Sequence, residues 1–390
     1  MKSLRRFAKI RRWSRRRGNM VAMFALLLVP LCAFTAFAVD IGYISITRTQ
    51  LQGATDGSAL AAALQLGPGL GPGNNPTQTT VASNGRTAAS AVASANPNGD
   101  KSSVYLNTSD GIQFGRRYSN GTTWINSWGT QPYNLVSVTA NRGTGNSSAG
   151  DSPLPLFFAR LIGNKTANLS VTSHAALLPG VGFSIGANSN LTSAPILPIA
   201  YDETSWNQLL AGVGSDAYSY NSSTGAVTAG SDGVLEIDLY PYGNQSLTPG
   251  NRGTVKIGVS NNSTATLSDQ ILNGVSIDQL ATIGGSITIP NGSSITLGGN
   301  PGLSAAIKSP LTAIIGQPRA IPIFRSVSGP GNNAQYQIVK FVGIRILDVQ
   351  LTGGTKYVKA QPAVLMSETV TYGTATNVSD YIYTKPKLVN

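Results

Sequence analysis

Two side chains that can serve as a catalytic base or nucleophile occur once each in this chain. They are one histidine, His174, and one cysteine, Cys32. As a general base, His174 would need a nucleophile and an orienting acid, and the sequence assigns neither. The surrounding Ser-Val-Thr-Ser-His-Ala-Ala favours a strand histidine whose ring nitrogen is satisfied locally. Cys32, inside an apolar run, is the single cysteine, so no disulfide can form within the chain and the fold must be held by core burial.

Two pairs of acidic residues have a spacing that could do chemistry. Glu236 and Asp238 are two positions apart in Val-Leu-Glu-Ile-Asp-Leu-Tyr, so a strand would present both from one face. Two carboxylates that close could bind a cation or act on a glycosidic bond. The interpretation that we prefer is a solvated strand face. Asp202 and Glu203 form a second acidic pair, in a predicted loop, with the same interpretation.

Other candidate ligand sites are weaker still. A group of tyrosines could form a platform for a sugar or a peptide, although tyrosines in the core or on the surface are commoner; they are Tyr218, Tyr220, Tyr240 and Tyr242. The glycine-rich stretch 298–302 lacks the Lys and Ser/Thr of a phosphate-binding loop. We therefore predict no catalytic residue, no cofactor site and no metal site, and expect a protein that is not an enzyme.

The positive charge is concentrated at the N-terminus. Nine of the 28 basic residues fall within residues 1–17, with no acidic residue among them. The other 19 basic residues face 16 acidic ones, so residues 18–390 carry only +3 of the net charge of +12. Residues 1–17 read as a basic cytoplasmic tail. The nearly neutral remainder disfavours a nucleic-acid-binding body.

An uncharged apolar segment follows this tail, from Met20 to Val39. Twenty helical residues at about 1.5 Å each span about 30 Å, the thickness of a bilayer's hydrocarbon core. Basic residues stay on the cytoplasmic side, which predicts a single-pass protein of the inner (cytoplasmic) membrane with a periplasmic body. The alternative is a signal peptide cleaved after Ala38, although the apolar run is longer than usual. Positions that represent the anchor are Met20, Phe24, Leu27, Pro30, Phe34 and Val39.

The helical pattern continues to Leu66, so the anchor is expected to extend into a stalk over residues 18–66. Small residues recur at a spacing of four along this stalk, in two adjacent rows where another helix could approach closely. These rows predict an oligomer formed through the stalk helix; the alternative is that the helix packs on its own domain. The rows consist of Gly53, Gly57 and Ala61, and of Ala54, Ser58 and Ala62.

The same stretch resembles a known family. Residues 16–31 read RRGNMVAMFALLLVPL, residues 38–42 read AVDIG, and residues 48–63 read RTQLQGATDGSALAAA. In order and spacing this is similar to the N-terminal segment of TadE/TadG-like Flp pilus-assembly proteins. Pseudopilins of that system that are processed by prepilin peptidase carry Glu five residues after the processed glycine, and here that position is Met23. The resemblance therefore implies a TadG-like, permanently anchored protein. The Asp-x-Ser-x-Ser of a von Willebrand-type metal site, present in some TadG-like proteins, does not occur.

Beyond the stalk, glycine-rich turns and alternating runs predict an α+β body that is mainly β with a few short helices. We expect a linker with a short helix over 67–98, a β-rich subdomain over 99–179 and a β-rich C-terminal domain over 180–390. Predicted strands are 104–106, 112–117, 135–140, 167–178, 335–351 with a bulge at 346–347, and 357–365, and a hairpin is predicted around Asn291-Gly292. Predicted helices are 87–95, 154–162, 267–272, 278–283 and 303–315.

The composition and the apolar segment predict a membrane-anchored, non-enzymatic protein, and the resemblance implies that it is an assembly component of a Flp (Tad)-type pilus or secretion system. Its expected partners are the lipid bilayer and other pilus-assembly components, with no nucleic acid. The competing prediction is a secreted or surface β-rich binding protein, for example one that binds carbohydrate, released after Ala38.

Overall fold

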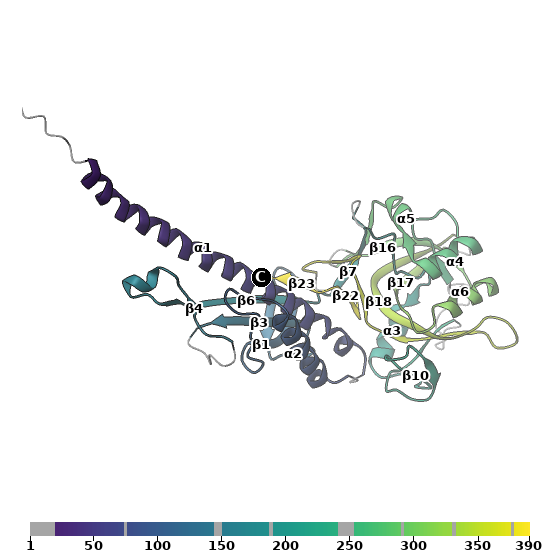
Figure 1. The fold of residues 1–390 in the computed structure, drawn as a ribbon. Coiled ribbons are helices and arrows are strands. Elements are labelled where there is room, and N and C mark those ends of the chain that lie inside the picture. Colours follow the sequence, from purple (N-terminus) through teal and green to yellow (C-terminus); the bar gives the residue numbers. More distant parts are fainter. Residues whose placement is uncertain are drawn as a thin grey trace, which may run out of the picture.

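The computed structural model describes residues 20–73, 76–143, 150–186, 190–240, 253–289, 292–329, 333–375 and 378–390. One long helix, α1 (Met20–Leu64), leads away from a β-rich body, as Figure 1 shows. The predicted fold class, a long N-terminal helix followed by a mainly β body with a few short helices, is confirmed. The predicted basic tail, residues 1–17, lies outside the described residues.

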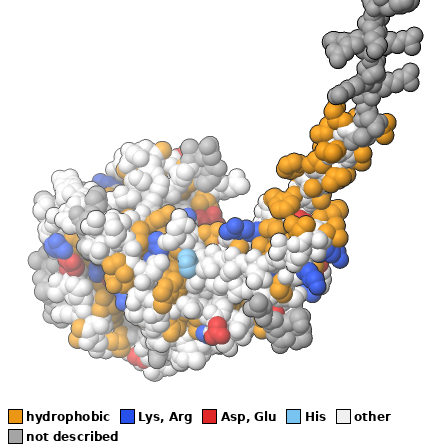
Figure 2. Space-filling model, turned by 90° about the vertical axis from the view of Figure 1, so that its left-hand side faces the viewer, with side chains coloured by type: hydrophobic (Ala, Val, Ile, Leu, Met, Phe, Trp, Pro, Cys, Tyr) orange, Lys and Arg blue, Asp and Glu red, His pale blue; other side chains and the backbone are white. Residues whose placement is uncertain are grey.

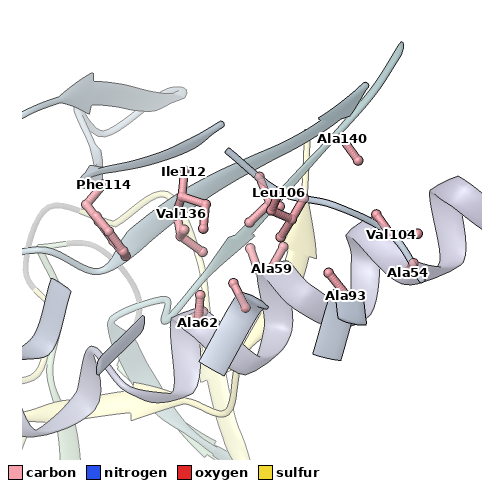
Figure 3. Close-up of a cluster of buried hydrophobic side chains, with 14 of the residues drawn as sticks. Ala54, Ala59, Ala62, Ala93, Val104, Leu106, Ile112, Phe114, Val136 and Ala140 are labelled. Atoms are coloured by element: carbon pink, nitrogen blue, oxygen red, sulfur yellow. The ribbon is translucent and has the colours of Figure 1, made fainter. Parts of the chain in front are cut away.

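The first part of the body is built on the C-terminal half of α1. That half packs across a five-stranded sheet of order β2-β1-β3-β6-β23 and against helix α2 (Gln78–Ser94). Alanines of both helices meet branched and aromatic side chains of the strands in one core (Figure 3). The strands are β1 (Ile112–Ser119), β2 (Trp124–Trp128), β3 (Leu135–Arg142), β6 (Leu169–Ala176) and β23 (Lys387–Val389).

The segment between α1 and the sheet is more ordered than a linker. A 3-10 turn, η1 (Gly67–Leu70), follows α1, and α2 begins where the Thr77 hydroxyl accepts a hydrogen bond from the Thr80 amide at 3.2 Å. The helix predicted over 87–95 therefore starts about ten residues too late, because the Thr-, Ser- and Asn-rich first turns have low helix propensity and depend on burial. The strand predicted over 104–106 is wrong: Val104 and Leu106 are buried, but the segment pairs with no strand.

A small hairpin leaves this first part of the body beside α1. Strand β4 (Leu154–Pro155) pairs antiparallel with β5 (Thr166–Ala167), and between them lies the 3-10 turn η3 (Ala159–Ile162). The single helix predicted over 154–162 is therefore wrong in its first half, where Pro155 sits in an extended strand. Figure 1 shows this hairpin reaching alongside α1.

The second part of the body is centred on the longest strand, β18 (Ala334–Gln350). It pairs with strands on both sides in a seven-stranded sheet of order β12-β19-β18-β16-β13, to which β17 and β9 are added. The bounds are β9 (Tyr201–Asp202), β12 (Ile237–Tyr240), β13 (Gly253–Val255), β16 (Ile295–Pro301), β17 (Pro318–Ser328) and β19 (Tyr357–Pro362).

Short elements cover this sheet. The helices are α3 (Glu203–Leu210), α4 (Thr264–Asn273), α5 (Ile277–Ala281), η5 (Ala305–Ile307) and α6 (Lys308–Ala313). The small sheets pair β7 (Gly180–Ser184) with β15 (Ser286–Thr288) and β21 (Val370–Tyr372), β8 (Ser193–Ala194) with β14 (Val275–Ser276), β10 (Tyr218–Tyr220) with β11 (Val227–Ala229), and β20 (Leu365–Ser367) with β22 (Ile382–Thr384).

Two strand predictions for this region have opposite outcomes. The bulge predicted at 346–347 is confirmed, since the register between β18 and β19 shifts between Ile346 and Asp348. The hairpin predicted around Asn291-Gly292 is wrong in its pairing, because β15 pairs with β7 whereas β16 pairs with β18 and β13. Asn291 itself lies outside the described residues.

The C-terminal strand returns to the first part of the body. Strand β23 pairs antiparallel with β6, placing Lys387 opposite Ala176 and Val389 opposite His174. The C-terminal strand of the 180–390 segment thus completes the sheet of the 99–179 segment.

Candidate membrane anchor and its junction with the body

The N-terminal half of α1 carries the apolar segment. Between Met20 and Val39 the large apolar side chains are solvent-exposed, with Phe24 and Phe34 both 75% exposed. Within the described residues, α1 is the one helix long and apolar enough to span a membrane, and only 6% of its most apolar stretch is buried in the protein. A core helix of a soluble protein would be mostly buried, and this segment is not. Figure 2 shows the apolar side chains along the helix up to the body.

The hydroxyl group of the apolar segment is hydrogen-bonded within its own helix. Thr35, the one hydroxyl-bearing residue from Met20 to Val39, donates to the Leu31 carbonyl at 2.9 Å, one turn back. Pro30 lies inside the continuous helix, as membrane helices tolerate. The single cysteine, Cys32, is exposed on this helix. A continuous helix whose hydroxyl side chain bonds to its own backbone suits a hydrocarbon environment.

Asp40, the first residue beyond the segment, joins α1 to the hairpin. Its carboxylate is 4% exposed and accepts three backbone hydrogen bonds, from the amides of Phe157 (2.8 Å), Phe158 (3.0 Å) and Ala159 (2.6 Å). These amides open the turn η3, whose own N-cap residue offers no side-chain acceptor. Asp40 therefore caps a helical turn that lies more than one hundred residues away in the sequence.

Further along α1, polar side chains fix the helix to the sheet. Gln50 accepts a hydrogen bond from the Gly99 amide at 2.9 Å. Gln52 donates to Asp56 (2.8 Å) and to the Ser173 hydroxyl (2.9 Å) of β6, and this hydroxyl donates to Asp56 at 2.5 Å. Leu51 between them is fully buried. The Gln-Leu-Gln-x-Ala-x-Asp pattern over 50–56 is thus the docking face of α1.

The small-residue stripe divides between buried and open positions. Ala54, Ser58 and Ala62 are buried in the first core, as the alternative of packing on its own domain predicts. A Cβ atom at Gly57 would lie 3.3 Å from Val92 of α2, so this glycine lets α2 approach closely. Gly53 is exposed with open space around it. The helix that approaches the stripe at Gly57 is therefore α2 of the same chain.

The comparison with known families falls on this helix. Residues 18–65 match the model of a family described as putative Flp pilus-assembly TadE/G-like. This segment is TadE/G-like. The matched range contains the apolar segment, Asp40 and the docking face. No curated protein and no solved structure matches the chain.

The TadE/G-like match supports a role related to Flp pilus assembly. Together with one exposed apolar helix, it fits a protein anchored in a membrane. What the sequence missed is the partner of Asp40, although an acid placed directly after an apolar run is a signal that could have prompted the search.

The histidine outside the TadE/G-like segment lies on a strand, as predicted, but its Nδ1 is not hydrogen-bonded. His174 lies on β6 with its ring centroid 5.5 Å from that of Trp128, and its Nδ1 is buried without a hydrogen-bond partner. The prediction that the ring nitrogen is hydrogen-bonded locally is therefore wrong for Nδ1. Burial lowers the pKa of the His174 imidazole below its usual range, and the Arg117 guanidinium lowers it further.

The first acidic pair is occupied by structural bonds. Glu236 is only 5% exposed, so the predicted solvated face is wrong for it. Its carboxylate accepts from the amides of Ala217 and Tyr218, both at 2.7 Å, because the 215–218 segment covers it. Asp238 forms an ion pair with Lys359 at 2.6 Å. Neither carboxylate is free to hold a cation or to attack a sugar.

The second pair and the tyrosines have similar roles. Asp202 caps α3 by accepting from the Ser205 amide at 2.8 Å, and Glu203 pairs with Arg325 at 2.7 Å. The Tyr218 hydroxyl donates to Asp348, and the Arg345 guanidinium lies 3.4 Å from the centre of the Tyr220 ring; Tyr240 is half-buried and Tyr242 lies outside the described residues. Among the described residues, no group of three or more His, Cys, Asp or Glu could hold a metal ion.

Proposed function

We propose that the protein is a non-enzymatic, single-pass component of a Flp (Tad)-type pilus assembly system, anchored by Met20–Val39. The observation that carries this proposal is the continuity of α1. One helix of 45 residues has an exposed apolar half and a half fixed in the core of the body. Because no flexible joint separates the two halves, a load on the body reaches the membrane through a rigid element.

The orientation follows from charge. The nine basic residues within 1–17 precede the apolar segment, and Asp40 follows it. Under the positive-inside rule the tail stays in the cytoplasm and the body lies on the other side of the cytoplasmic membrane. The proposed partners of the body are other pilus-assembly or secretion components.

The uninterrupted helix supports a retained anchor over release after Ala38. The Ala36-Phe37-Ala38 sequence is helical, and Asp40, two residues beyond it, is bonded to the hairpin. Membrane fractionation with intact-mass measurement tests this point. A retained anchor leaves the full N-terminus in the membrane fraction, whereas a soluble protein that begins at Val39 would instead support the secreted binding protein.

Association of two copies through α1 stays a prediction. Of the stripe residues, Ala54, Ser58 and Ala62 are covered by the protein's own fold, so a second helix would have to approach on the side of Gly53.

The pilus role is tested by complementation. Deleting the gene should abolish surface filaments, counted by electron microscopy, and the full chain should restore them. A chain in which Met20–Val39 is replaced by an unrelated transmembrane helix of equal length should restore them too, if the anchor acts mechanically. Unchanged filaments in the deletion strain would contradict the proposed role.

A further inference from the structure

The end of the β4–β5 hairpin gathers exposed apolar side chains. Phe157, Phe158, Leu161 and Ile162 are 50%, 42%, 82% and 68% exposed, all within six consecutive residues. Leu161 is the most exposed large apolar side chain among the described residues. We call these four residues the tip. Such a cluster marks a contact with another apolar phase, because single exposed apolar residues are common but adjacent ones are not.

The tip is held at the depth where the apolar segment of α1 ends. The amides of Phe157 and Phe158 donate to Asp40, the first residue after Val39. The Phe157 ring packs on Tyr43, one turn further, with 5.0 Å between the ring centroids. If Met20–Val39 spans the hydrocarbon core, these contacts place the tip at the boundary of that core on the side of the body.

The hairpin has a defined conformation that presents the tip. The Leu156 amide donates to the Lys165 carbonyl at 3.0 Å, which extends the β4–β5 pairing. Gly163 closes η3 in the left-handed region, with φ of 100°, where a side chain would be strained. At its base, the buried Arg142 donates to the carbonyls of Ser152 (2.8 Å) and Pro153 (3.4 Å). These hydrogen bonds fix the conformation of the hairpin that carries the tip.

The charged neighbours of the tip match a lipid interface. Arg160, between Phe158 and Leu161, and Lys165, beyond Ile162, are both exposed, and the described hairpin carries no acidic residue between Leu154 and Ala167. Aromatic rings and basic side chains are favoured at the level of lipid headgroups, where the rings contact acyl chains and the cations contact phosphates.

We propose that the tip is a second membrane contact, inserted into the interface of the leaflet that faces the body. The inference rests on the proposed anchor, since the tip is continuous with it through Asp40. A second contact beside the helix would fix the tilt and rotation of α1, which a single span leaves free. The body would thereby be held at a set angle to the membrane.

Depth-dependent quenching in lipid vesicles tests this proposal with the full chain. Cys32 is replaced by serine, and single cysteines at Leu161, Phe34 or Val213 carry an NBD fluorophore. Val213 is the matched control, because it is also an exposed apolar residue (64%) but follows α3 in the second part of the body. The vesicles contain phosphatidylcholine and phosphatidylglycerol, with or without lipids brominated near the headgroup.

Since interfacial segments lie about 5–10 Å below the headgroup–acyl boundary, shallow bromines should quench the Leu161 probe about twofold or more and leave the Val213 probe unchanged. An unquenched Leu161 probe beside a quenched Phe34 probe would overturn the tip contact and leave the anchor intact. Loss of quenching at both sites would refute the anchor, and the tip contact with it. A blue-shifted Leu161 probe that responds to protein density and not to bromine would show that a second copy covers the tip, and would also overturn the proposal.

Discussion

Replacing Leu27 and Leu31 by arginine should remove the protein from the membrane. Both leucines are exposed on one face of α1, 60% and 63%, so neither change creates a cavity in the protein. Four Leu, three Phe and three Val between Met20 and Val39 favour insertion by roughly 0.3–0.6 kcal/mol each, or about 3–6 kcal/mol together. Each central arginine costs about 2.5–3.5 kcal/mol, so two cost about 5–7 kcal/mol and cancel the gain. A single substitution should leave insertion weakened but measurable.

The assay is carbonate extraction of membranes followed by immunoblotting of the pellet and the supernatant. A matched control places arginines at Ser45 and Thr49, which have the same spacing on an exposed part of the same helix beyond Asp40. The control should stay in the pellet and the Leu27→Arg/Leu31→Arg variant should not. If the double variant remains in the pellet as fully as the wild-type chain, the apolar segment is not what holds the protein in the membrane.

Three further outcomes are expected from the described contacts. Arg142→Met should lower the free energy of unfolding by about 3–5 kcal/mol in urea titrations, because it removes a buried donor from Asp100 and from three carbonyls. Lys101→Met, which breaks a long, partly exposed ion pair of 4.0 Å with Asp100, should change it by less than about 1 kcal/mol. As the only histidine, His174 should titrate in NMR below about pH 6.5, since burial and Arg117 lower its pKa. The contribution of His174 to stability is then present above that pH and lost as the pH falls through the folded-state pKa. The free energy of unfolding of the wild-type chain should therefore fall more steeply between pH 7 and pH 5 than that of His174→Gln. Equal pH dependence in the two proteins would contradict the lowered pKa. Asp40→Asn should speed hydrogen exchange of the Phe157, Phe158 and Ala159 amides, while amides of β18 stay unchanged, and equal exchange in both proteins would show that the cap is dispensable.

Features that depend on a residue's own neighbours were predictable from the sequence. The slip in apolar phase from Ile346 to Leu347 located the bulge of β18, because one extra residue in a strand reverses which side chains face the core. The limits of the apolar segment were equally local, since they depend on twenty consecutive side chains. The hairpin predicted from Asn291-Gly292 was wrong because this dipeptide favours a turn, whereas the pairing of the flanking strands depends on residues far away in the sequence.

The contacts of the junction could not be predicted in the same way. Asp40 and its three amide donors are separated by more than one hundred residues, and one chain offers no pattern that links them. Glu236 reads as an outward-facing strand residue, and only the folded path of the 215–218 segment buries it. In both cases a carboxylate that looks solvent-exposed in the sequence is buried by a segment that the fold brings over it.

The pairing of β23 with β6 gives the second part of the body two covalent attachments to the first. The polypeptide leaves the sheet after β6 and comes back to the neighbouring strand, so the intervening segment behaves as an insertion. Two chain connections restrict rotation of the second part of the body relative to the first more than one connection would. A tensile force applied to the second part of the body would be shared between the two chain connections. Both connections would have to extend before the second part separated from the first.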